Sequence, residues 1–273
     1  MQLLWESVTL LSEDLMRVVS FVSYVCGGRP RTQSEIDAAT FIKAIKGDGV
    51  AGSFSRLDTR DRLEAAEWFG EMGALILDMK RLRGPIVLVP VPDSSCTSAS
   101  ARMPRTALLA QCLARHLANA IVVDGLRWQR TVRPSHDGGT RDPARLHANL
   151  ILLATIPQGT SVIVDDVLTT GGHIRAAAAK VSTLTSNPCV HAICLAKAVS
   201  RQELECFEIV ETELPVFCAS EPQRRNTMAS EASVKLPTPL GNLRSSCLEQ
   251  LRQSCHQDLR VKWLLNETDV RFR

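Results

Sequence analysis

Apolar runs and helix-like segments alternate along the middle of the chain. Three short runs are rich in β-branched residues and lie next to turn residues or prolines, a pattern typical of strands buried in a parallel sheet. Segments with apolar residues at helical spacing precede and separate them. The predicted strands are residues 86–92, 162–167 and 190–199. The predicted helices are residues 34–46, 60–82, 106–119 and 174–180. This order of elements predicts an α/β domain.

Both ends of the chain have amphipathic patterns. Residues 3–26 place apolar side chains near one helical face, interrupted by charged residues, so we expect one or two helices that do not enter a membrane. Residues 242–265 resemble another amphipathic helix. The sequence therefore divides into a helical N-terminal extension (1–50), an α/β domain (51–200) and a C-terminal extension (201–273). The two extensions are candidates for homodimer formation or for binding a partner protein.

Composition sets the broad class. With 273 residues, of which 45% are hydrophobic, the chain is long enough to bury a sizeable core. A net charge of +3 is too small to argue for a nucleic-acid partner. The nine cysteines include no C-x-x-C pair, which is typical of reduced thiols, so we expect a cytoplasmic protein without a disulfide framework.

Residues suited to binding a sugar phosphate gather at the end of the 162–167 run. Asp165 and Asp166 are adjacent, and neighbouring residues of a strand face opposite sides. Because an unpaired charge in an apolar core is costly, we expect them at the sheet edge, where carboxylates bind sugar hydroxyls or approach a hydrated Mg²⁺. Hydroxyls and glycines follow at Thr169, Thr170, Gly171 and Gly172. They precede a predicted helix whose N-terminus favours phosphate, so the stretch predicts a ribose-phosphate site.

The stretch VIVDDVLTTGGH, residues 162–173, resembles the phosphoribosyl-pyrophosphate (PRPP) signature of the type I phosphoribosyltransferases. The resemblance implies a doubly wound, mostly parallel α/β sheet of that family's kind, with helical additions at the N- and C-terminal ends. His173 stands where the family usually has a hydroxyl residue. A protonated imidazole at this position could replace the phosphate contact of that hydroxyl.

Two further stretches narrow the resemblance to the ComF-like branch of this family. Residues 42–47 (IKAIKG) and 89–92 (VPVP) precede the motif in the order and spacing of that branch. The cysteine-rich zinc element that usually precedes them in the branch is missing here. Since the VPVP loop resembles the pyrophosphate loop of the family, the resemblance assigns substrate binding to residues that follow it. These residues are Ser94, Ser95, Arg102 and Arg105, with Asp93 as a further candidate.

Residues 126–150 form an arginine-rich segment with two adjacent glycines. We interpret it as too polar for the core and as suited to a lid over an anionic ligand. ComF-like relatives have a basic residue a few positions before an asparagine here, and Arg145 and Asn149 are similar. A disordered surface loop is the alternative. Direct nucleic-acid binding is not expected, because only Trp128 offers a stacking surface near these arginines.

The resemblance implies transfer of the 5-phosphoribosyl group of PRPP to a nitrogen nucleophile, with release of pyrophosphate. Asp165 and Asp166, as catalytic residues, would hold the ribose hydroxyls and help to orient Mg²⁺, while residues 169–173 bind the 5′-phosphate. The acceptor is unidentified. Thr169 stands where 6-oxopurine enzymes have a base-contacting carboxylate, which argues against hypoxanthine or guanine. Two alternatives stay open: a non-catalytic PRPP- or nucleotide-binding regulator, and an accessory protein of DNA uptake or mobile-element biology.

Overall fold

A computed structural model describes residues 15–25, 32–46, 59–80, 82, 84–134, 138–185, 191–200, 206–207 and 209–218. The chain divides into two compact units, Met1–Ser220 and Glu221–Arg273. All described residues belong to the first unit, and the predicted helix over 242–265 lies outside them. No helix in the described ranges is long and apolar enough to cross a membrane.

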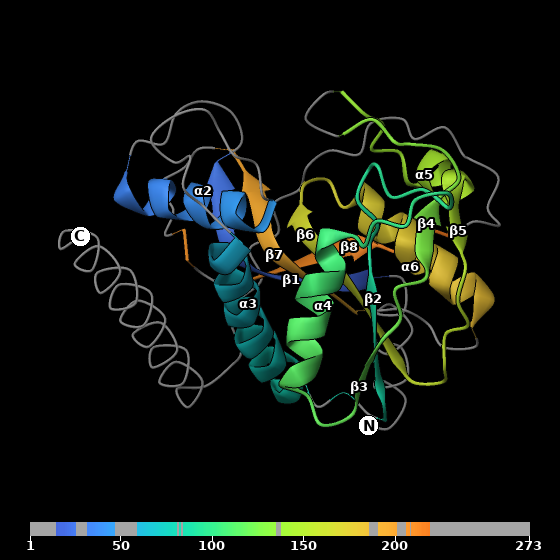
Figure 1. The fold of residues 1–273 in the computed structure, drawn as a ribbon, viewed down its shortest axis with the longest axis horizontal. Coiled ribbons are helices and arrows are strands. Elements are labelled where there is room, and N and C mark those ends of the chain that lie inside the picture. Colours follow the sequence, from blue (N-terminus) through green and yellow to red (C-terminus); the bar gives the residue numbers. More distant parts are fainter. Residues whose placement is uncertain are drawn as a thin grey trace, which may run out of the picture. The chain divides into compact units, whose positions relative to one another are not determined.

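A six-stranded sheet forms the centre of the first unit (Figure 1). Its strand order is β3-β2-β6-β7-β1-β8, and every neighbouring pair is parallel except β1 and β8, which are antiparallel. The strands are β1 (Leu15–Val25), β2 (Ile86–Pro90), β3 (Ala120–Val122), β6 (Thr160–Leu168), β7 (His191–Val199) and β8 (Val210–Pro215). The three predicted strands are confirmed as β2, β6 and β7.

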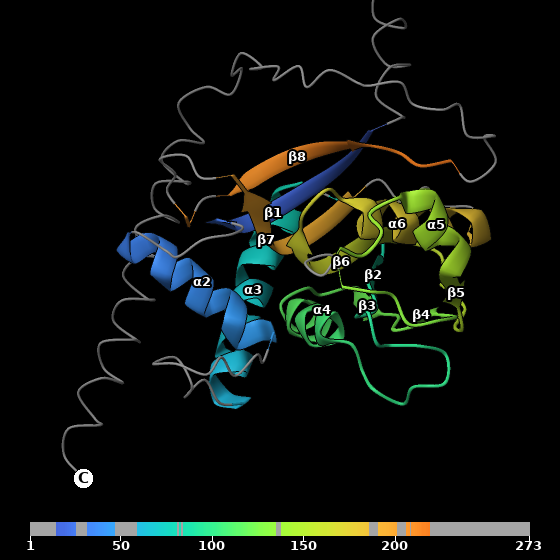
Figure 2. The same cartoon turned by 90° about the horizontal axis from the view of Figure 1, so that it is seen from above.

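Helices cover both faces of this sheet (Figure 2). On one side lie α2 (Gln33–Lys46), α3 (Thr59–Met79) and α4 (Arg105–Arg115), and on the other lie α5 (Pro143–Asn149) and α6 (Gly172–Leu184). Helices α3 and α4 approach closely because Gly70 has no side chain: a Cβ there would lie 2.7 Å from the backbone carbonyl carbon of Cys112. The predicted doubly wound, mostly parallel α/β fold is confirmed.

The helices expected over residues 3–26 are wrong for Leu15–Val25, which form β1 within the sheet. This strand pairs in parallel with β7 on one side and antiparallel with β8 on the other. Its interior positions are buried on both faces, which requires apolar residues at nearly every position and obscures the alternation of a half-exposed strand. Residues 1–14 lie outside the described part of the chain.

The expectation that residues 126–150 are too polar for the core is also wrong. The segment contains β4 (Leu126–Trp128) and β5 (Leu150–Leu152), which pair antiparallel, and α5 lies between them in the sequence. Its buried side chains belong to the main core; they are Leu126, Trp128, Val132, Leu146 and Leu150. Arg130, Arg133, Arg141 and Arg145 are exposed. The segment is therefore anchored by apolar residues while these four arginines remain in solvent; the fifth, Arg127, is largely buried and pairs with Asp124.

Truncation of Phe21 in β1 should test whether this strand is a core element. Phe21 is 2% exposed and packs edge to face against Trp68 and Phe69. Phe21→Ala should lower the free energy of unfolding, measured by chemical denaturation, by about 3–5 kcal/mol. Leu15→Ala, on the same strand but at a side chain that is 36% exposed, is the control and should cost less than about 1 kcal/mol. Equal effects of the two substitutions would contradict the position of β1.

Candidate functional site

The parallel pairing of β2 with β6 brings two loops to the same edge of the sheet. The paired residues run from Ile86↔Thr160 to Pro90↔Val164, and the N–H of Val91 donates to the carbonyl of Val164 at 2.9 Å. Parallel strands present their carboxyl ends at one edge, which is where open α/β sheets bind ligands. The loop after β2, residues 93–104, therefore lies beside the end of β6.

The two adjacent carboxylates at the end of β6 have different environments. Asp165 is buried, and its Oδ1 accepts a hydrogen bond from the N–H of Asp166 at 2.8 Å. Burial raises the pKa of Asp165 well above its usual value, and the neighbouring charge of Asp166 raises it further. The side chain of Asp166 is 16% exposed. Asp166 is thus the carboxylate with solvent access, and Asp165 holds its backbone in place.

Arg105, the first residue of α4, connects the loop after β2 with the end of β6. Its Nε lies 3.3 Å from Asp93 Oδ1, and its Nη2 lies 3.4 Å from Asp166 Oδ2. Its backbone N–H donates to Asp93 Oδ2 at 3.2 Å, and its Nη1 donates to the carbonyl of Lys46 at 3.4 Å. Burial raises the pKa of Asp93, although the charge of Arg105 acts in the opposite direction. The structure therefore brings together Asp93, Arg105 and Asp166.

Beyond the acidic pair, the chain turns sharply into α6. Gly171 is the N-cap of this helix and has φ 76°, a left-handed conformation that favours glycine. No side chain caps the helix, so the N–H groups of its first turn keep their capacity to bind an anion. Thr169 is half-buried and Thr170 is exposed. A Cβ on Gly172 would overlap the carbonyl oxygen of Arg141, so this glycine permits a close approach of the 126–150 segment.

His173 packs against Trp128 at this turn. The two ring centroids are 5.7 Å apart at an interplanar angle of 77°. Trp128 Nε1 donates to the carbonyl oxygens of Pro92 at 3.2 Å and Asp93 at 3.0 Å. Burial lowers the pKa of His173, with the charge of Asp166 as a smaller opposing effect. Burial therefore disfavours the protonated imidazole at this position, and a phosphate contact by His173 stays a prediction. Trp128 is fully buried and offers no surface for base stacking.

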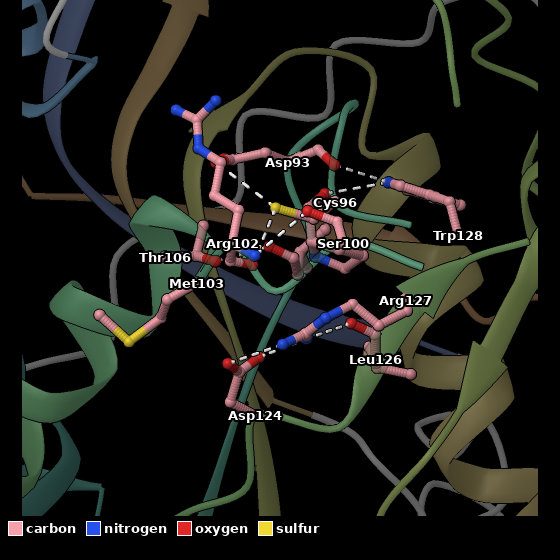
Figure 3. Close-up of polar contacts among 12 residues, drawn as sticks. Asp93, Cys96, Ser100, Arg102, Met103, Thr106, Asp124, Leu126, Arg127 and Trp128 are labelled. Carbon is pink, nitrogen blue, oxygen red and sulfur yellow. Dashed lines mark hydrogen bonds and ion pairs between the residues drawn. The ribbon is translucent and has the colours of Figure 1, made fainter. Parts of the chain in front are cut away.

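Residues 93–104 fold back on themselves (Figure 3). The thiol of buried Cys96 lies 4.0 Å from Asp93 Oδ2 and 3.7 Å from the carbonyl oxygen of Arg102, whose own N–H donates to Ser100 Oγ at 3.1 Å. Ser95 and Arg102 are exposed, and the carbonyl of half-buried Ser94 accepts from the N–H of Val132 at 2.9 Å. Substrate binding by Ser94, Ser95 and Arg102 stays a prediction.

Arg145 and Asn149 have separate contacts. The Arg145 side chain is 79% exposed, with its Nε 3.6 Å from Asp142 Oδ2. The amide of Asn149 donates to the carbonyl of Arg130 at 2.8 Å and accepts from its N–H at 3.0 Å. Asn149 thus fixes the segment after β4 to the end of α5. A substrate contact by Arg145 stays a prediction.

A magnesium ion would need oxygens that this chain does not supply alone. In the described ranges, no three His, Cys, Asp or Glu side chains are grouped as a metal site. Asp165 and Asp166 offer hard oxygen ligands, but Mg²⁺ prefers six and commonly completes its shell with phosphate oxygens and water. The residues therefore fit a Mg²⁺ that arrives with a bound phosphate compound.

Two contributions to the site were missed in the sequence. The first is the pair of hydrogen bonds from Trp128 to the chain after β2. A single tryptophan within an arginine-rich segment was the signal in the sequence that could have indicated a buried anchor there. The second is Leu214 on β8, because a Cβ on Gly171 would overlap its Cδ1. No local pattern around Leu214 indicates that it contacts a turn more than forty positions earlier.

Replacement of the buried carboxyl at Asp165 should change the pH dependence of stability. The pKa of Asp165 is raised in the folded state. Between its unfolded-state pKa, about 4, and its higher folded-state pKa, the folded chain binds more protons than the unfolded chain. The free energy of unfolding therefore falls as pH rises through that interval. Asp165→Asn keeps an oxygen for the Asp166 N–H and does not titrate. The variant should therefore unfold at a higher temperature than the parent chain at pH 7–8, and the difference should shrink toward pH 4.

Asp166→Asn is the matched control for this stability measurement. It removes the charge that pairs with Arg105 and should give no comparable gain at pH 7–8. If Asp165→Asn unfolds at the same temperature as the parent chain at every pH, Asp165 is not a buried carboxyl with a raised pKa.

Comparisons with known proteins give a distant likeness. No family model matches the chain, and no curated protein matches it. Two crystal structures of a hypoxanthine phosphoribosyltransferase from Staphylococcus aureus are similar to it. The orthorhombic form is 12% identical over 54% of this chain and 72% of that chain, with a TM-score of 0.31. The tetragonal form is 11% identical over 54% and 71%, with a TM-score of 0.32. Similarity at this level does not identify a function.

Proposed function

We propose that this chain binds PRPP at the carboxyl ends of β2 and β6 and transfers its 5-phosphoribosyl group to a nitrogen nucleophile, releasing pyrophosphate. The observation that carries the proposal is Arg105, which lies within 3.4 Å of both Asp93, in the loop after β2, and Asp166, near the end of β6. This charged cluster adjoins an α6 N-terminus without a side-chain cap. Carboxylate, guanidinium and free helix N–H groups are the partners that a ribose, a pyrophosphate and a 5′-phosphate require.

The turn from Thr169 to His173 is the proposed 5′-phosphate site. Gly171 and Gly172 leave the backbone N–H groups unobstructed by their own side chains, and Thr169 and Thr170 add hydroxyl donors. His173 takes part as a neutral imidazole, since burial lowers its pKa. A neutral ring still has one N–H to donate, so loss of the usual hydroxyl does not abolish hydrogen bonding here.

Asp165 and Asp166 have different roles at the ribose. Asp166 has solvent access and accepts hydrogen bonds from the ribose hydroxyls, while Asp165 positions it through the bond to its N–H. Departure of pyrophosphate from C1′ generates an oxocarbenium-like transition state, whose positive charge the Asp166 carboxylate stabilises. Arg105, with Arg102 on the exposed loop, favours the leaving pyrophosphate. When bound, Mg²⁺ would neutralise pyrophosphate charge beside these two carboxylates.

The acceptor is proposed to be a nitrogen nucleophile other than hypoxanthine or guanine, since Thr169 replaces the base-contacting carboxylate of 6-oxopurine enzymes. Membership of the ComF-like branch and a cytoplasmic location stay predictions. The Staphylococcus aureus structures belong to a hypoxanthine enzyme, and their acceptor is not assigned to this chain.

Calorimetric titration of PRPP with Mg²⁺ tests the proposal. Asp166→Asn should weaken PRPP binding by about tenfold or more, because a hydrogen bond to a charged group is lost. The matched control is Asp78→Asn, an exposed aspartate near the end of α3, where the chain approaches the amino end of β2 rather than the carboxyl end that forms the site, and this variant should bind as the parent chain does. A screen for pyrophosphate release over nucleobases and other nitrogen compounds should then identify one acceptor.

The outcomes separate the candidate functions. Binding that Asp166→Asn weakens, with release for one acceptor, supports a transferase. Binding without release for any acceptor supports the non-catalytic regulator. If the parent chain does not bind PRPP, the proposal is wrong, and the accessory role through the ends of the chain becomes the better hypothesis.

A further inference from the structure

The chain after β8 leaves the edge of the sheet and reaches the start of α6. Figure 2 shows this segment running from β8 past α6 toward α5. Leu214 occupies the space that a Cβ on Gly171 would need, so its side chain lies directly against the left-handed turn. Leu214 also packs against the main hydrophobic core, which fixes its own position.

Two further contacts hold the same segment. Arg175, in the first turns of α6, donates from Nε to the carbonyl of Pro215 at 2.7 Å. The rings of Phe217 and His147 of α5 have centroids 5.7 Å apart. Leu214, Pro215 and Phe217 therefore contact the turn, α6 and α5 in succession. We refer to residues 214–217 as the C-terminal strap.

The contact of Arg175 is unusual for its place in a helix. A cation near a helix N-terminus is disfavoured by the helix dipole, and burial lowers the pKa of Arg175 with Asp142 as an opposing charge. The Pro215 carbonyl offsets part of that cost by accepting from the guanidinium. The bond consequently ties the strap to the same helical end that carries the proposed phosphate site.

We infer that Leu214 and Arg175 are positioning residues for the 5′-phosphate turn, and that the C-terminal strap holds the turn in its anion-binding conformation. This inference rests on the proposed function. Gly171 has no Cβ, so its backbone is free to leave φ 76° unless neighbouring atoms restrict it. Leu214 supplies that restriction on one side, and the carbonyl of Arg141 against Gly172 supplies it on the other. Neither the C-terminal strap nor Arg175 contacts the substrate in this proposal.

Leu214→Ala and Arg175→Met test the inference. Leu214→Ala opens space beside Gly171, and Arg175→Met removes the Nε donor while keeping an unbranched apolar side chain. Each should weaken PRPP binding by on the order of tenfold, because small displacements of binding groups have large effects. In a transferase, the loss should appear mainly in KM for PRPP. Val210→Ala is the control: it shortens another half-buried side chain of β8, four residues from Leu214, at the far end of the strand.

Hydrogen exchange of the full chain without ligand gives a readout that does not depend on PRPP. Amides of residues 169–175 should exchange faster in Leu214→Ala and Arg175→Met than in the parent chain, and Val210→Ala should leave them unchanged. Faster exchange in this turn together with weaker PRPP binding would support the inference. PRPP binding equal to that of the parent chain in both variants would overturn it.

Failure of the proposed function gives a different result. If the parent chain does not bind PRPP, the proposed function is wrong, and hydrogen exchange alone decides whether the strap positions the turn. Unchanged exchange at residues 169–175 in both variants then overturns the inference, whereas selective acceleration supports it.

Discussion

The parallel pairing of β2 with β6 is the constraint on which the candidate site depends. Because the strands are neighbours with Pro90 opposite Val164, the chain after β2 and the chain after β6 leave the sheet at the same edge. Arg105 can then lie within ion-pair distance of Asp93 and of Asp166, which are far apart in the sequence. Shifting this register would separate the arginine from one carboxylate and leave a half-buried charge without its partner.

The charges at this edge are only partly balanced. Asp93 and Asp166 both lie within ion-pair distance of the Arg105 guanidinium, Asp165 is adjacent to Asp166, and burial raises the pKa of both Asp93 and Asp165. A cluster with more carboxyl groups than cations stabilises an added positive charge. In the proposed reaction, a metal ion and an oxocarbenium-like sugar would both bring positive charge to this position.

The local part of the fold and site could be predicted from the sequence because its signals are local. The run Val162–Val164, the acidic pair and the glycines before α6 are contiguous, and each has a structural reason that does not depend on distant partners. Strand β1 could not be predicted in this way. The apolar residues of β1 are compatible with one face of an amphipathic helix and also with a strand that is buried on both sides. The pairing with β7 and β8, which are distant in the sequence, selects the strand. The same holds for residues 126–150, where arginines conceal the buried positions of Trp128 and Leu146.

Strand β1 also affects the site, although it contributes no binding group. It lies between β7 and β8, and among the described strands β8 has its backbone pairing with β1. The position of Leu214 against Gly171 thus depends on a strand from the N-terminal part of the chain, with Met16 opposite Leu214 in the register. The geometry of a turn at the centre of the sequence is therefore set by pairing between segments near residues 20 and 212. This arrangement gives β1 and β8, at the edge of the sheet remote from β2, a physical connection to the α6 N-terminus.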